Sequence, residues 1–127
     1  MAVQNSDAYD DNNIFARILR GEIPAKLVFE NEYALAFDDI NPQAPVHVLV
    51  IPKGRYISLA DFSAEAPADL QAGFWRAVGE VARRLGLEEA GYRILSNAGG
   101  HGHQEVPHLH VHIFGGRPLG PMLARQA

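Results

Sequence analysis

The chain has 127 residues, which is enough for one domain with a single hydrophobic core but not for two. Apolar residues make up 47% and charged residues 20% of the chain, as in an ordinary globular protein, and the formal net charge of −4 gives no reason to expect a nucleic-acid partner. With no cysteine and no apolar run near the roughly 20 residues of a membrane span, the sequence excludes disulfides and thiolate metal sites and predicts no membrane segment.

The N-terminal part predicts a tail followed by one short helix. Residues 1–11 are polar and acidic, which indicates a flexible tail without the basic and apolar regions of a signal peptide, and we therefore expect a cytoplasmic protein. Residues 14–20 carry apolar side chains at helical spacing. Asn12 or Asn13 fits the N-cap of this helix, and Gly21 fits its stop signal.

Three strands are expected next. Residues 26–30 and 33–38 read as the two strands of a β-hairpin. A loop with two prolines follows at residues 39–45. Residues 47–51 are apolar at nearly every position, which predicts a strand that is buried on both faces and therefore central in its sheet.

A connection is expected at residues 52–66, and then a long helix at residues 67–85 that stops at Gly86. Apolar residues recur in this helix every three or four positions, at Leu70, Phe74, Val78, Val81 and Leu85. Trp75 and Ala82 widen the apolar stripe beyond one sheet face. This width fits either a broad core contact or a subunit contact.

The last part of the chain predicts two more strands. Residues 92–97 form the first, residues 98–103 a glycine-rich loop, residues 104–114 a strand with three histidines, and residues 115–127 an extended C-terminal tail. The five strands are mostly adjacent in sequence and too close together for crossover helices. We therefore expect an α+β domain at residues 12–114, with a five-stranded antiparallel sheet, one short helix and one long helix.

Three histidines, His108, His110 and His112, alternate with apolar residues in the last strand. Because successive side chains of a strand point to opposite faces, the histidines should share one face, with neighbours roughly 6.6 Å apart. One use of such a row is metal binding, since neutral imidazole suits zinc, copper and iron. Further ligands are available for a metal in His47, His101, His103 and Glu105.

The other use of the row is phosphoryl or nucleotidyl transfer. A large fraction of imidazole is unprotonated and nucleophilic at neutral pH, while neighbouring imidazoles can bind phosphate oxygens. The glycine-rich loop before the strand supplies main-chain N–H groups, which favour an anion. This layout fits phosphate chemistry somewhat better than metal binding, but the spacing alone leaves both open.

The run His-Leu-His-Val-His-Ile-Phe at residues 108–114 resembles the signature of the histidine triad family. The resemblance covers residues 12–123 and points to the nucleotide-binding branch, and to its bacterial members in particular. The segments that carry it are residues 14–18, 21–25, 37–45, 47–53, 91–93 and 115–121.

This resemblance implies a homodimer in which each subunit has a five-stranded antiparallel sheet and the long helix helps to build the subunit contact. It implies hydrolysis of purine nucleoside 5′-phosphoramidates, such as adenosine 5′-phosphoramidate or a lysine-linked adenylate, to the nucleoside monophosphate and an amine. No metal or other cofactor is required in that scheme. The C-terminal tail would pack near the active site.

The resemblance also implies roles for individual residues. His110 matches the nucleophile, which forms a covalent nucleotidyl-histidine intermediate that water then cleaves. His108 matches the residue that orients the nucleophile, and His112 and His47 match contacts to phosphate or leaving-group oxygens. Asp39 matches the carboxylate that holds the ribose hydroxyls. Without the resemblance, Asp39 reads better as a turn residue.

The remaining positions concern the nucleotide and its leaving group. Asn97 and Gln104 match polar contacts to the phosphate, and Glu105 stands where many relatives carry Ser or Thr near the leaving group. The apolar cleft for the base would be formed by Ile14, Phe15, Ile18, Phe37 and Ile40. The alternative function is a nucleotide-binding or zinc-binding regulatory module whose catalysis is vestigial.

Overall fold

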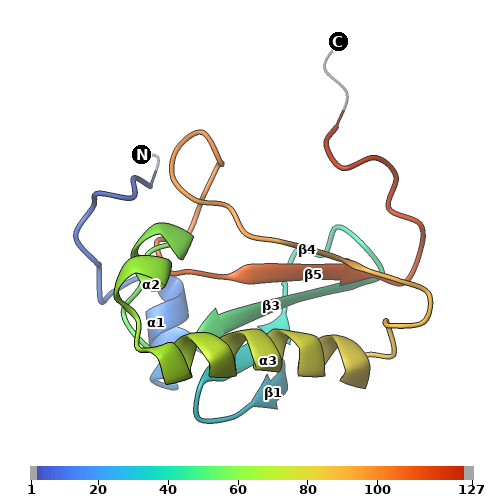
Figure 1. Cartoon of the computed structure of the whole chain (residues 1–127), viewed down its shortest axis with the longest axis horizontal. Helices are drawn as coiled ribbons and strands as arrows, with labels where there is room; N and C mark the ends of the chain where they lie inside the picture. Colours follow the sequence, from blue (N-terminus) through green and yellow to red (C-terminus); the bar gives the residue numbers. More distant parts are fainter. Residues whose placement is uncertain (1–2, 125–127) are drawn as a thin grey trace.

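The computed structural model describes residues 3–124 and has a five-stranded antiparallel sheet with strand order β1-β2-β3-β5-β4 (Figure 1). The α+β prediction is confirmed, with β3 in the central position that was expected for it. The elements in chain order are α1 (Ile14–Leu19), β1 (Leu27–Glu30), β2 (Ala34–Asp38), β3 (Val46–Pro52), α2 (Leu59–Glu65), α3 (Ala68–Arg84), β4 (Arg93–Leu95) and β5 (Val111–Gly115).

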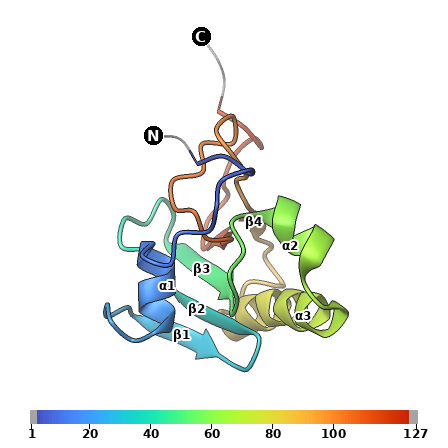
Figure 2. The same cartoon turned by 90° about the vertical axis from the view of Figure 1, so that its left-hand side faces the viewer.

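Helices cover the two faces of the sheet unequally, with α1 on one side and the other two helices on the opposite side (Figure 2). The larger core cluster joins alternate residues of β2, β3 and β5 to Phe62 of α2 and Phe74 of α3. The smaller cluster joins Phe15 of α1 to the other face of β2 and β3. Because side chains alternate along β3, His47 lies on the α1 face together with Leu49.

Both predicted helices are confirmed, with their termination signals. Asn13 is the N-cap of α1, and its side-chain oxygen accepts a hydrogen bond from the Ala16 N–H at 2.9 Å. The long helix α3 begins directly after Pro67. It ends before Gly86, whose φ of +72° lies in the left-handed region that glycine adopts without strain.

The prediction that residues 52–66 are only a connection is wrong, because they contain α2. Ser58 and Asp61 form a capping box, in which the side chain of each residue accepts a hydrogen bond from the main-chain N–H of the other. Phe62 is the one buried residue of this two-turn helix. With one buried residue, the sequence of α2 shows no repeat of apolar residues at helical spacing.

The predicted strand at residues 104–114 is correct only from Val111 onward. Before that point the main chain makes other bonds, since the N–H of His108 donates to Val106 O at 2.9 Å and the N–H of Leu109 donates to Tyr56 O at 2.8 Å. Pro107 has no N–H to offer to a neighbouring strand. Among the three histidines, only His112 therefore lies within β5.

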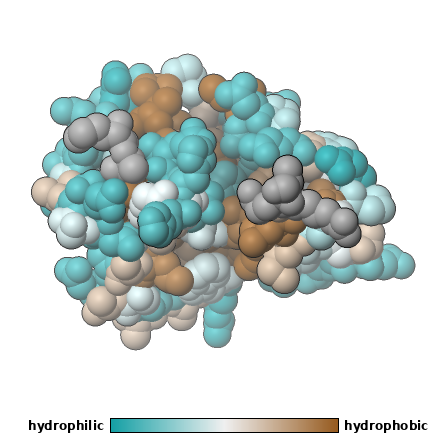
Figure 3. All heavy atoms as spheres, turned by 90° about the horizontal axis from the view of Figure 1, so that it is seen from above, coloured by the Kyte–Doolittle hydropathy of each residue, from teal (hydrophilic) through white to brown (hydrophobic). Residues whose placement is uncertain are grey.

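The segment expected as a loose N-terminal tail makes specific contacts with the domain. Val3 is buried, and the Tyr9 hydroxyl lies 2.7 Å from Nδ1 of His108. At the other end, Arg93 of β4 donates to the carbonyl oxygen of Gly120 at 2.8 Å, while Met122 is exposed. The face seen from above in Figure 3 is mostly hydrophilic, with separate hydrophobic areas. No helix within residues 3–124 is long and apolar enough to span a membrane.

Candidate active site

The triad histidines lie at the α1 face of the sheet, where β3 and β5 pair side by side. His112 is opposite Leu49 and His47 is opposite Phe114, so both histidines and Phe114 share this face. The rings of His110 and His112 are 5.1 Å apart, and those of His112 and Phe114 are stacked. The predicted shared face is thus confirmed for His110 and His112, although the rings come closer together than the strand spacing alone suggests.

His108 is fully buried at the inner end of this row, and its two ring nitrogens have different partners. Nε2 lies 3.1 Å from the carbonyl oxygen of Pro52, which can only accept, so Nε2 carries the proton. Nδ1 is then an acceptor and takes the hydrogen bond of the Tyr9 hydroxyl. Burial lowers the pKa of His108 to about 4, so the ring is neutral at pH 7.

His110 has its Nδ1 2.7 Å from the main-chain oxygen of His108. A carbonyl oxygen requires a donor, so Nδ1 carries the proton and the lone pair of the neutral ring is on Nε2. Burial lowers the pKa of His110, and its ring and that of Phe15 pack edge to face at 4.9 Å between centroids. Ser96 donates to the main-chain oxygen of His110 at 2.8 Å, which fixes the backbone there.

A chain of hydrogen bonds orients His47 and His112. The main-chain N–H of Gln43 donates to Nδ1 of His47 at 3.1 Å, and Nε2 of His47 therefore donates to Nδ1 of His112 at 2.9 Å. The proton of His112 is then on Nε2. Burial, together with His110 and His47, lowers the pKa of His112 to about 4.

Asp39 stands beside this chain, directly after β2. Its Oδ1 accepts from the Asn41 N–H at 2.8 Å, as a turn residue does, while Oδ2 lies 3.4 Å from Nε2 of His47. Burial lowers the pKa of His47, and the Asp39 charge acts against that shift. Asp39 thus combines the turn role with a place in the site.

The predicted cleft residues divide into buried walls and exposed edges. Phe15 and Phe37 are buried and pack edge to face at 5.4 Å, and Ile18 lies half-buried against the same cluster. Ile14 and Ile40 are exposed. The structure therefore brings three of the five apolar positions together and leaves two at the surface.

The predicted polar residues lie in different surroundings. Gln104 is buried, and its amide is occupied by the N–H of Gly99 and the carbonyl oxygens of Ile57 and Val106. It thus fastens the glycine-rich loop to the domain instead of pointing a free group at a ligand. Asn97 is half-buried. Glu105 is exposed.

A metal could be held by Asp39, His47 and His112, whose ligand atoms lie within 4.8 Å of one another; they form the one such group in the described part of the chain. An ion on Nδ1 of His112 would have to replace the hydrogen bond from His47. His101 and His103, the other candidate ligands, are exposed, and His103 lies 3.4 Å from Glu105.

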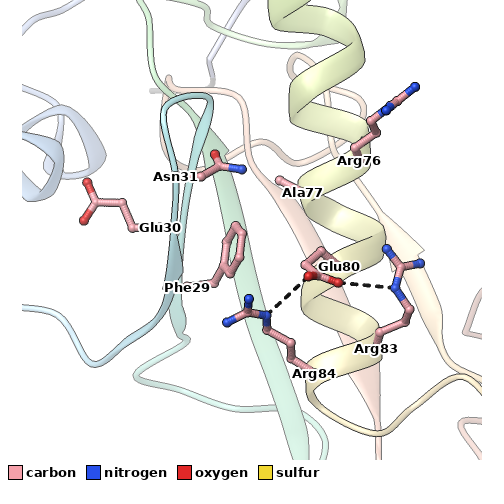
Figure 4. A pocket seen from close by; sticks show the side chains of 8 residues that line it. All are labelled: Phe29, Glu30, Asn31, Arg76, Ala77, Glu80, Arg83 and Arg84. Carbon is pink, nitrogen blue, oxygen red and sulfur yellow. Dashed lines mark hydrogen bonds and ion pairs between the residues drawn. The ribbon is translucent and has the colours of Figure 1, made fainter.

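Two cavities lie near these elements. One of about 430 Å³ is lined by Asp39, Ile40 and His47 and so adjoins the site. The other, of about 480 Å³, lies between α3 and the β1–β2 hairpin on the opposite face (Figure 4). Arg83 and Arg84 line that second cavity, where both pair with Glu80. None of the residues that line it belongs to the histidine site.

Sequence reasoning missed several partners of the histidines. The carbonyl oxygen of Pro52 and the N–H of Gln43 are main-chain groups, so the type of side chain at these positions does not reveal them. Tyr9 stands in a polar stretch without any apolar period. The tyrosine itself was the one available signal, as the only aromatic residue of the expected tail.

Comparisons with known proteins agree with this geometry. The family model of the HIT domain matches residues 20–119. An uncharacterised HIT-like protein of Azospirillum brasilense is 66% identical over 92% of this chain and 96% of its own length. The purine nucleoside phosphoramidase of Escherichia coli K12 is 44% identical over 91% of this chain and 97% of its own length. A solved HIT family hydrolase of Clostridium thermocellum is 38% identical, with a TM-score of 0.82 over 91% of this chain and 99% of that one. The chain belongs to the HIT domain family, and it is a hydrolase.

Proposed function

We propose that the protein hydrolyses purine nucleoside 5′-phosphoramidates to the nucleoside monophosphate and an amine, through a nucleotidyl intermediate on His110. The observation that carries this proposal is the bonding of His110. Its Nδ1–H is held by the His108 carbonyl oxygen, which leaves the lone pair of Nε2 for attack. The preference for a purine phosphoramidate is taken from the resemblance and from the name of the Escherichia coli relative.

In the first step, Nε2 of His110 attacks the α-phosphorus and forms a P–N bond. The bond between phosphorus and the leaving nitrogen breaks, its electron pair stays with the nitrogen, and the amine takes one proton from solvent. The positive charge that develops on the His110 ring is stabilised by the His108 carbonyl oxygen at Nδ1–H. In the second step, water attacks phosphorus, the pair of the P–Nε2 bond returns to His110, and one proton is released.

Neighbouring groups would bind the rest of the substrate. His112 carries its proton on Nε2, so it can donate to a phosphate oxygen while His47 holds its other nitrogen. Oδ2 of Asp39, the oxygen that does not accept from the Asn41 N–H, suits the ribose hydroxyls. Phe15 and Phe37 would form the wall for the base, with Ile18 beside them. The exposed Ile14 and Ile40 would close over the base from the rim, and Asn97 and Glu105 would face the phosphate and the leaving amine.

The active form would be a homodimer in the cytoplasm, with no cofactor. In support of the dimer, β4 is a three-residue strand at the edge of the sheet, and an edge strand offers main-chain groups to a further strand. Three large side chains on α3 and around β4 are more than a third exposed, namely Trp75, Tyr92 and Ile94. Sedimentation should give the mass of a dimer for the wild type and of a monomer for Ile94→Lys. A monomeric wild type would contradict this part of the proposal.

The direct test is hydrolysis of a fluorogenic adenosine phosphoramidate by chelator-treated protein. Wild type, His110→Ala and His101→Ala are compared, because His101 is an exposed loop histidine and serves as the matched control. We expect turnover in wild type and His101→Ala, none in His110→Ala, and retained binding of adenosine monophosphate in all three. Mass spectrometry after rapid acid quench should find the nucleotidyl group on the peptide that contains His110.

The second candidate function is a zinc-binding regulatory module, which is favoured by the convergence of Asp39, His47 and His112. The same assay separates the two functions. If chelated wild type is inactive and zinc restores turnover, or if zinc binds without any turnover, the histidines act as ligands and the nucleotidyl mechanism does not hold.

A further inference from the structure

The N-terminal segment supplies one of the two hydrogen bonds that hold the ring of His108. The Tyr9 hydroxyl lies 2.7 Å from Nδ1, although the two residues are 99 positions apart in the sequence. Pro52 O holds Nε2 on the other side at 3.1 Å. Since no other partner of Nδ1 is found within residues 3–124, the hydroxyl of Tyr9 alone satisfies this buried acceptor.

Tyr9 is itself held in place by the domain. The guanidinium of Arg55 lies over its ring at 5.1 Å from the centroid. The same guanidinium donates to both carboxylate oxygens of Asp11, at 2.8 and 3.0 Å. Farther along, the buried Ser58 hydroxyl donates to the side chain of Asn5 at 2.8 Å. Three separate contacts therefore fix this segment on the loop between β3 and α2.

We propose that Tyr9 is a positioning residue for the reaction at His110. This inference rests on the proposed function. The ring of His108 is clamped between Tyr9 and Pro52, and the carbonyl oxygen of the same residue accepts the Nδ1–H of His110. A ring that is held at both nitrogens fixes the main chain at His108, and this carbonyl fixes the tautomer and direction of the nucleophile. Loss of the Tyr9 hydroxyl leaves the buried Nδ1 without a donor and the ring held only at Nε2 by Pro52.

The test is Tyr9→Phe in the full-length protein, which removes the hydroxyl and keeps the ring under Arg55. Tyr33→Phe is the matched control, since the ring of Tyr33 packs against Gly73 of α3, on the other side of the sheet from this cluster. We expect kcat of Tyr9→Phe to fall about ten-fold with KM changed less than about two-fold, because a misdirected nucleophile affects the chemical step and not substrate binding. Quenched-flow should show the same fall in the rate at which the nucleotidyl intermediate forms. Tyr33→Phe should match the wild type.

A spectroscopic readout does not depend on turnover. The ¹⁵N resonance of His108 Nδ1 should move downfield in Tyr9→Phe, as an acceptor nitrogen does when it loses its donor, and should stay in place in Tyr33→Phe. A moved resonance with unchanged kcat would overturn the positioning role, and an unmoved resonance would overturn the hydrogen bond itself. If the wild type hydrolyses no phosphoramidate, the proposed function fails, and the resonance then decides separately whether Tyr9 holds His108.

Discussion

Nε2 of His47 donates its proton to Nδ1 of His112 across 2.9 Å, from the central strand to its neighbour β5. The direction of this bond is set from outside the pair, because the main-chain N–H of Gln43 occupies the other nitrogen of His47. His112 is thereby left with its proton on Nε2. The site thus contains one imidazole with an outward proton, His112, next to one with an outward lone pair, His110.

Replacement of His47 tests this directed bond. Glutamine can place its amide nitrogen near the position of the imidazole Nε2, so His47→Gln should keep the bond to His112 and retain kcat within a few-fold. His47→Leu removes the donor and should lower kcat about ten-fold or more. Steady-state kinetics of the two variants give the answer. Equal losses in both would show that the bond to His112 does not carry the effect.

Asp39 is expected to hold the ribose through Oδ2, the oxygen that does not accept from the Asn41 N–H. Asp39→Asn should raise KM for the adenosine substrate by about ten-fold, as expected for loss of a charge-assisted hydrogen bond. Its effect should be much smaller on a 2′,3′-dideoxy substrate, which has no hydroxyls to lose. Asp38→Asn is the control, since Asp38 is the preceding half-buried carboxylate and pairs with Lys26 instead. The role fails if both substrates respond alike to Asp39→Asn.

Stability should fall in mild acid because of His108. The folded protein keeps this ring neutral down to a pKa of about 4, whereas the unfolded chain protonates it near 6.5, so the unfolded state binds more protons between these values. The contribution of His108 to the free energy of unfolding should therefore be complete above about pH 6.5. It should fall by roughly 3 kcal/mol as the pH decreases to 4. Urea titrations at several pH values should show a shallower slope for His108→Gln and an unchanged slope for His101→Gln.

Gln104 should matter for stability more than for phosphate binding. Its buried amide makes three hydrogen bonds within the protein, so Gln104→Ala leaves main-chain groups unpaired and should cost about 1–3 kcal/mol in free energy of unfolding. Gln43→Ala is the control, because the side chain of Gln43 is exposed and only its main chain bonds the site. Chemical denaturation measures both. If Gln104→Ala left the stability unchanged and raised KM, Gln104 would contact the substrate, as the resemblance implies.

The sheet and the helices α1 and α3 were predictable because their apolar residues recur at the spacing of a strand or a helix. Alternation along β3 and β5 is visible in the order of the residues, and it is enough to place His47 and His112 each on a defined face of its strand. The helix α2 was not predictable from periodicity, since it buries only Phe62, although the spacing of Ser58 and Asp61 is a capping signal that could have found it. Pattern alone thus reveals elements that bury several residues.

The candidate site was predictable in its residue types but not in its bonding. The row of histidines pointed to nucleophilic or metal chemistry, but the choice of protonated nitrogen on each ring depends on Pro52 O, His108 O and the N–H of Gln43. These are main-chain groups, whose positions follow from the folded backbone. The three hydrogen bonds of the Gln104 amide were not predictable for the same reason, because the loop that it fastens takes its shape only in the tertiary structure.

The contact between Tyr9 and His108 also orders events during synthesis. The ribosome makes Tyr9 99 positions before His108. Contacts of such long separation form late, since a large loop must close first. A nascent chain can therefore pair β1, β2 and β3 and form α1, α2 and α3 before His108, His110 and His112 are translated, and the hydrogen bond that holds the ring of His108 on the Tyr9 side closes only after them.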